Sequence, residues 1–257
     1  MKKILVHGNS STRWKWPTWP DFLSYYIKDS EIINIAKPGI SNWSIAREIV
    51  NSVKKMRDID HVYVMWGDPC RNDTFLKGKK TVIPNKDMWG MYDKDFQWTI
   101  LYNGKVHTAE NQNLDRIKTL ESILYTQMFL EKNNVKHTMM IYDTRTLPLD
   151  VDLSKAELEL KKEIDWSCFQ FYNTCFGMRD FTKKLYPDQF VDKFEKDTYH
   201  HPLPLAHYKW VKDIMFNSDL EIPQHMQLKF ESWKELDIPN QRWIKDASRV
   251  YDWGDDD

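Results

Sequence analysis

The chain has 257 residues, and its 37 Lys and Arg against 38 Asp and Glu give a formal net charge of −1. Such a balance argues against a protein built to bind nucleic acid or anionic surfaces. The cysteines Cys70, Cys168 and Cys175 are odd in number and follow no metal-ligand spacing, so neither a disulfide framework nor a zinc site is predicted. No apolar run approaches the length of a membrane span or a signal peptide, so we expect a protein cytoplasmic in its producing cell.

Short apolar runs alternate with amphipathic segments along the chain. The runs predict strands at 4–6, 32–36, 61–66 and 138–142. The amphipathic segments predict helices over 17–27, 41–56, 114–133, 154–164 and 205–216. Strand and helix in alternation predict an α/β domain, with a mostly parallel sheet and helices on both of its faces.

One segment, 73–112, interrupts this alternation. Asn103-Gly104 stands between the β-rich runs 96–102 and 105–108, which predicts an inserted β-hairpin as a substrate wall or a surface excursion. We therefore take 1–216 as one α/β domain that contains the insertion, since no linker divides it. Residues 217–257 are predicted to be an irregular extension with an acidic tail.

Polar loops follow the predicted strands, and in an open parallel sheet such loops converge at one edge. This places Ser10, the loops 39–42 and 67–72, and 143–145 on one rim. Ser10 is either in an ordinary turn or an oriented hydroxyl. A serine nucleophile needs a base, and the base needs an acid to orient it. Asp197 with His200 or His201 could supply both from the loop before the last helix.

These residues resemble the four spaced blocks of the SGNH, or GDSL-type, hydrolase superfamily. The blocks are Gly8-Asn9-Ser10, Pro38-Gly39, the polar turn that begins at Gly67, and Asp197 through Pro202. The turn 66–71, the segment 165–167 and the surroundings of His201 further resemble a bacteriophage-encoded branch of it. The resemblance covers 1–216 and implies a three-layer α/β/α, flavodoxin-like fold.

The resemblance also implies roles. Ser10 is the nucleophile, Asp197 the acid and His201 the base, with His200 as the alternative base. The N–H groups of Ser10 and Gly39 would stabilise the oxyanion. Two positions depart from the family pattern: Asn9 replaces the usual Asp, and Pro69, which has no donor, stands where the family has an oxyanion-hole Asn.

Other rim residues could complete the site. Arg71 or Asn72 could supply the missing oxyanion donor from the same turn. Asn42, Asp143 and Arg145 are candidates for substrate binding, and Asp143 is the second choice for the triad acid.

The expected function is ester hydrolysis through an acyl-serine, of the esterase or O-deacetylase type. An acylated glycan is the substrate that the family's habits suggest, together with four tryptophans expected to be exposed: Trp14, Trp16, Trp89 and Trp98. Acyl transfer would use the same residues. The alternative is a catalytically degraded binding or structural protein associated with a virion, which Pro69 and the extension favour. No cofactor, nucleotide or metal motif is present in the sequence.

Overall fold

The computed structural model describes residues 1–14, 16–69, 72–75, 98–101, 109–147, 153–191, 201–220, 223–226 and 228. For 72–75, 98–101, 109–113 and 191 the description covers the backbone alone. The predicted Asp197 and His200 lie outside these ranges, as do Cys70, Arg71 and Trp89.

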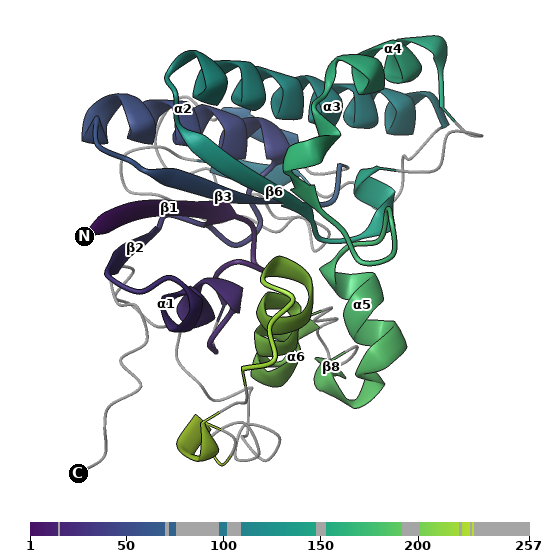
Figure 1. The fold of residues 1–257 in the computed structure, drawn as a ribbon. Helices are drawn as coiled ribbons and strands as arrows, with labels where there is room; N and C mark the ends of the chain where they lie inside the picture. The colour runs from purple at the N-terminus through teal and green to yellow at the C-terminus, as the bar shows by residue number, and fades with distance from the viewer. Residues whose placement is uncertain are drawn as a thin grey trace.

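The centre of the fold is a parallel sheet of five strands in the order β2-β1-β3-β6-β7 (Figure 1). The strands are β1 (Lys2–Gly8), β2 (Ser30–Asn34), β3 (His61–Trp66), β6 (Lys136–Ile141) and β7 (Phe169–Gln170). Leu5 of β1 pairs with Ile33 on one side and Val62 on the other. This is the strand order of flavodoxin-like folds, in which ligands bind beyond the carboxyl ends of the strands. The α/β class and the parallel sheet expected from the sequence are confirmed.

Helices cover both faces of the sheet, as Figure 1 shows. On one face lie α2 (Asn42–Met56), α3 (Ala109–Lys132) and α4 (Lys155–Glu163). On the other lie α1 (Leu23–Tyr26), α5 (Met178–Leu185) and α6 (Pro204–Lys209). Short 3-10 segments occur at Trp19–Phe22, Thr144–Thr146, Trp166–Cys168 and Pro187–Gln189, and a π-helix, Trp210–Met215, continues α6.

The side chains of β1 divide between two buried clusters because successive residues of a strand point to opposite faces. Ile4 and Val6 pack in the cluster that contains Trp19 and Trp210. Leu5 packs in the other, with Ile45 and Ile49 of α2. Two hydrophobic layers therefore enclose β1. The polar loop that follows it, residues 9–12, lies at the carboxyl edge of the sheet.

Some elements differ from the sequence expectations. The predicted helix at 17–27 is a 3-10 turn followed by the four residues of α1. Pro20 has no N–H to donate, which disfavours a regular α-helix that begins as early as residue 17. The fifth strand, β7, and helix α5 were not predicted.

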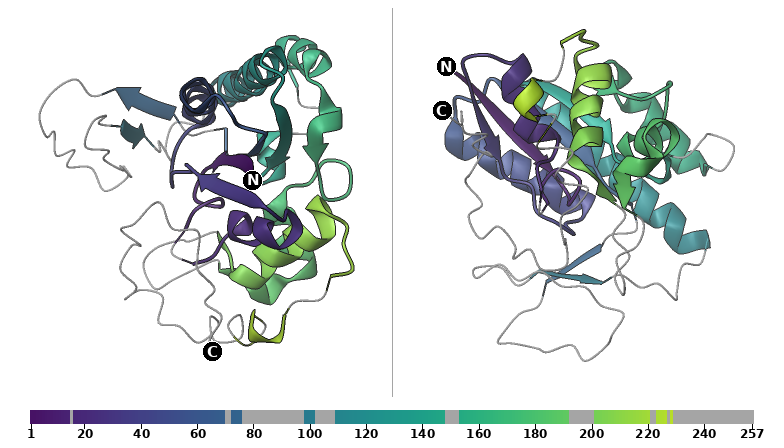
Figure 2. Two further views of the ribbon diagram at one scale, coloured as in Figure 1. Left: turned by 60° about the vertical axis from the view of Figure 1, so that its left-hand side comes forward. Right: turned by 90° about the horizontal axis from the view of Figure 1, so that it is seen from below.

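The inserted segment contributes an antiparallel pair, β4 (Asn72–Phe75) with β5 (Trp98–Leu101). Figure 2 shows this pair set apart from the main sheet. The predicted turn at Asn103-Gly104 and the run 105–108 lie outside the described residues. The division at residue 216 stays a prediction, since most of the extension also lies outside them. In the part of the chain that is described, no helix is both long and apolar enough to cross a membrane.

Candidate functional site at the carboxyl edge of the sheet

The loop after β1 holds Ser10 in a tight turn closed by its neighbour. The Asn9 side-chain oxygen accepts hydrogen bonds from the Ser11 N–H, at 2.8 Å, and from the Ser11 hydroxyl, at 2.6 Å. The Asn9 carbonyl accepts from the N–H groups of Thr12 and Arg13. Ser10 itself is 5% exposed. An amide oxygen at position 9 thus makes the acceptor contacts that a carboxylate would make, so this departure from the family pattern is compatible with a closed turn.

Two glycines allow close approaches at this edge of the sheet. A Cβ atom at Gly8 would lie 2.1 Å from Thr12 Oγ1 of its own loop and 2.9 Å from the Met65 carbonyl oxygen in β3. A Cβ atom at Gly67 would lie 2.1 Å from Asn9 Nδ2, so the third loop packs this closely against the first only with glycine at position 67.

The loop after β2 turns at Pro38-Gly39. The Ile40 N–H donates to the Lys37 carbonyl at 3.4 Å, and Gly39 has a φ of 81°. Proline followed by glycine at positive φ is typical of a type II turn. The Lys37 N–H donates to the Gly8 carbonyl, which ties this loop to the end of β1. Within the described residues, neither the Ser10 N–H nor the Gly39 N–H donates a hydrogen bond to the protein.

Asn42, the first residue of α2, holds the loop after β3. Its Oδ1 accepts from the Gly67 N–H at 2.8 Å, and its Nδ2 donates to the Gly67 carbonyl at 3.1 Å and to Thr119 at 3.0 Å. Thr146 also donates to the Gly67 carbonyl. Both ends of the buried Asn42 amide therefore bind the protein, and a substrate-binding role for this residue stays a prediction.

The third loop is described as far as Pro69. Asn72 begins β4, opposite Leu101, with its side chain outside the description, and Arg71 lies outside it altogether. The two candidates for the missing oxyanion donor therefore stay predictions.

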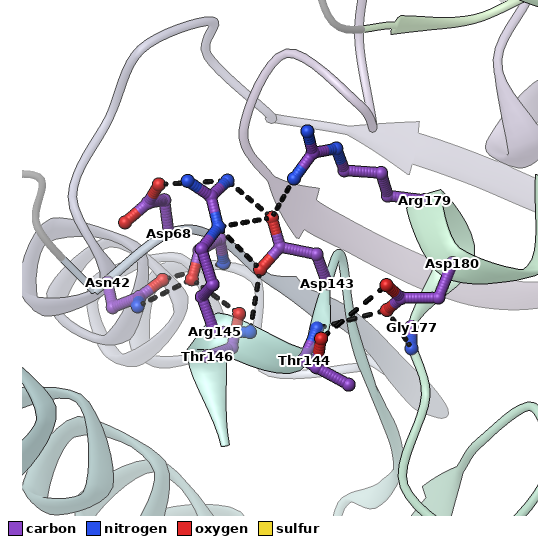
Figure 3. A network of polar contacts seen from close by, with 10 residues as sticks. Asn42, Asp68, Asp143, Thr144, Arg145, Thr146, Gly177, Arg179 and Asp180 are labelled. Atoms are coloured by element: carbon purple, nitrogen blue, oxygen red, sulfur yellow. Dashed lines mark hydrogen bonds and ion pairs between the residues drawn. The ribbon is translucent and has the colours of Figure 1, made fainter. Parts of the chain in front are cut away.

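The loop after β6 contains a network of charges (Figure 3). Asp143, 1% exposed, binds Arg145 Nη2 at 2.5 Å and Arg179 Nη1 at 3.3 Å. Arg145 Nη2 also lies 3.1 Å from Asp68, which follows Gly67. Arg145 thereby joins the third and fourth loops, which the sequence placed on one rim. Arg179, on α5, was not identified from the sequence because no local pattern relates it to a residue 36 positions earlier.

His201 lies in β9 (His201–Pro202), which pairs antiparallel with β8 (Phe190–Val191). Its ring centroid is 4.2 Å from that of Trp14 in the first loop and 6.4 Å from that of Tyr142 at the end of β6. The structure therefore brings the His201 ring to the loop that carries Ser10. The triad acid Asp197 and the alternative base His200 stay predictions, since both lie outside the described residues.

The buried side chain of Trp16 supports the segment at His201. Trp16 Nε1 donates to the Pro202 carbonyl at 2.9 Å. His207 is fully buried, and this burial lowers the pKa of its imidazole to about 3, against a smaller opposing effect of the Pro202 backbone. The expectation that Trp16 is exposed was wrong: it is 2% exposed. Trp14 is partly buried against His201, and Trp98 is described in its backbone alone.

The contacts of the buried side chain of His7, behind the first loop, were also missed. His7 is fully buried, with Nε2 3.3 Å from Glu48 Oε2, and Lys37 Nζ lies 2.9 Å from Glu48 Oε1. Burial lowers the pKa of His7. Burial opposes ionisation of Glu48, but contacts with His7 and Lys37 lower the pKa of this carboxyl overall. The available signal was the alternation of β1, which turns His7 toward α2, the same face as Leu5.

Among the described residues, no group of three or more His, Cys, Asp or Glu side chains could hold a metal ion.

No protein-family model matches the chain, and the search of curated proteins found no similar sequence. Two solved structures are similar in fold. One is a member of the lipolytic protein G-D-S-L family from Veillonella parvula, 13% identical, with a TM-score of 0.41 over 82% of this chain and 97% of that one. The other is the psychrotrophic esterase EstA from Pseudoalteromonas, inhibited by monoethylphosphonate, 12% identical, with a TM-score of 0.44 over 85% of this chain and 96% of that one.

Proposed function

We propose that this chain is a serine hydrolase of the SGNH type that cleaves carboxylic esters through an acyl-Ser10 intermediate. The observation that supports it best is the position of Ser10. This residue stands in a turn at the carboxyl end of a central strand, and the His201 ring lies against the same loop. Such an edge is where ligands bind in open parallel sheets.

The chemistry follows from these groups. The Ser10 Oγ attacks the ester carbonyl carbon while His201 takes the hydroxyl proton, and Asp197 orients the imidazole. The C–O bond to the alcohol then breaks, and His201 returns the proton to the leaving oxygen. Water, activated by His201, cleaves the acyl-serine in the same way and regenerates Ser10.

Two backbone donors are suited to the developing oxyanion. The N–H groups of Ser10 and Gly39 make no hydrogen bond within the described part of the protein, and they come from neighbouring loops. Pro69 supplies no third donor. Loss of one such donor costs about a hundred- to a thousand-fold in rate, so we propose that Arg71 or Asn72 replaces it or that turnover is slow.

An acylated glycan is the proposed substrate class, with Trp14 as the aromatic residue nearest His201 among the described rings. The exposed guanidinium of Arg145, held by Asp68 and Asp143, is the proposed polar contact for the substrate.

The test compares wild type with Ser10→Ala in hydrolysis of short-chain aryl esters and in labelling by a fluorophosphonate. Ser52→Ala, on the body of α2, is the matched control. Wild type and Ser52→Ala should be labelled and active, whereas Ser10→Ala should show neither property. Equal labelling of the two variants would refute the proposal. Adding an alcohol acceptor distinguishes acyl transfer, which would yield a new ester in place of the free acid.

Pro69 favours a second candidate, a binding or virion-associated structural protein that keeps the fold without the activity. A folded wild-type protein that is neither labelled nor active on any ester would favour this candidate.

A further inference from the structure

Trp14 connects the nucleophile loop to the base. It stands four residues after Ser10, and its ring centroid lies 4.2 Å from that of His201, with the two planes inclined at 44°. The ring of Trp14 also meets Trp16 edge to face, with centroids 6.2 Å apart. One short segment of the first loop therefore contacts the predicted base directly.

The backbone beside His201 is held independently of that ring contact. Trp16 donates to the Pro202 carbonyl, and β8 pairs with β9. Hydrogen bonds thus hold the main chain at His201, whereas the His201 ring contacts the ring of Trp14. A substitution of Trp14 can therefore alter the environment of the imidazole and leave these backbone hydrogen bonds in place.

We propose that Trp14 is a positioning residue that orients the His201 imidazole toward Ser10 and stabilises its protonated form through the indole face. The inference rests on the proposed function, in which His201 takes the Ser10 proton and becomes an imidazolium. A cation within about 6 Å of an indole centroid is attracted by the negative face of the ring. The neutral imidazole gains less, so the contact favours the charged state that forms during acylation.

The surrounding groups define what else acts on this ring. Among the described residues, the titratable side chain of Tyr142, just after the end of β6, also lies near His201, with ring centroids 6.4 Å apart. Asp143, next in the chain, is bound by Arg145 and Arg179, which balance its charge. Asp197, the proposed acid, lies outside the described residues. Each of these groups is the same in a Trp14 variant, so a change in His201 titration reports the indole.

The experiment uses Trp14→Leu, which removes the ring, and Trp14→Phe, which keeps an aromatic face. Trp43→Leu, an exposed tryptophan on α2, is the matched control. The pH profile of kcat/KM is measured for all variants. The ring signals of His201 are titrated by NMR in a Ser10→Ala background and assigned by their loss in His201→Gln.

For Trp14→Leu we expect kcat/KM to fall about three- to thirty-fold and the acid limb, with the His201 titration, to move down by about half to one pH unit. Trp14→Phe should recover at least part of both effects, and Trp43→Leu should show neither. An unchanged His201 titration in Trp14→Leu would overturn the inference, as would Trp14→Phe behaving like Trp14→Leu. If Trp14→Leu does not fold, Trp14→Met replaces it, since methionine fills the space without a ring.

The two proposals fail separately. If Ser10→Ala remains active, the proposed function is wrong, yet the His201 titration still reports the indole contact. If Ser10→Ala is inactive and the His201 imidazole titrates in the Trp14 variants as it does with Trp14 present, the proposed function is supported and the proposed role of Trp14 is wrong.

Discussion

Replacing Asn42 by alanine should destabilise the protein through one backbone group. The amide of Asn42 accepts from the buried Gly67 N–H and donates to the Gly67 carbonyl and to Thr119. The carbonyl keeps its bond from Thr146, but the N–H loses its acceptor. An unsatisfied buried donor costs about 1–3 kcal/mol and a further lost hydrogen bond about 1 kcal/mol, so the free energy of unfolding should fall by about 2–4 kcal/mol.

The assay is urea unfolding followed by tryptophan fluorescence and by circular dichroism, whose agreement tests for a two-state transition. Asn51→Ala, on the exposed side of the same helix, should change the free energy of unfolding by less than about 0.5 kcal/mol. Asn42→Asp should also be destabilised, because it places a carboxylate oxygen against the Gly67 carbonyl. If Asn42→Ala were as stable as Asn51→Ala, the bridge to Gly67 would not hold the third loop.

Three other substitutions test the same structure. The pKa of His207 is about 3 in the folded chain and about 6.5 in the unfolded chain, so the unfolded chain takes up a proton first as the pH falls. The free energy of unfolding should therefore be highest above about pH 6.5 and lower by about 2 kcal/mol at pH 5. His207→Gln should lose correspondingly less in urea unfolding across this range, and equal pH dependence would contradict the assignment. Gly67→Ala should displace Asn9 and lower both ester hydrolysis and the melting temperature; unchanged values would show that the loops relax freely. Ser154→Ala removes the capping box of α4 and should cost about 1 kcal/mol in the same unfolding assay, unlike a substitution at the exposed Lys155.

The features that sequence predicts well here are local ones. Residues 61–66 form β3 as expected, and α2 begins after Ser41, whose side chain accepts from the Ser44 N–H. In both cases the signal lies within one element: an unbroken apolar run, or a cap followed by residues with helical spacing. Convergence of the strand ends followed from the parallel topology, because that topology requires no side-chain detail.

The features that were missed depend on distant partners. β7 has two residues and exists because Phe169 pairs with Met139, which no local pattern announces. Trp16 was expected to be exposed, but it is buried and donates a hydrogen bond to the carbonyl of Pro202, 186 positions away. Distant partners also decide the contacts within the site: Asn42 bonds Gly67, and Asp143 bonds Arg179.

The contacts around Gly67 have a consequence for how the site forms. Asn42 is 25 positions from Gly67 and Thr146 is 79, while Thr119 is 77 from Asn42. No fragment that ends before β6 can contain this set, so the edge of the sheet acquires its shape only when most of the chain is already ordered. Long-range closure of this kind slows folding and makes it cooperative. A nascent chain that ends before Thr146 should therefore lack the full set of hydrogen bonds that hold the third loop.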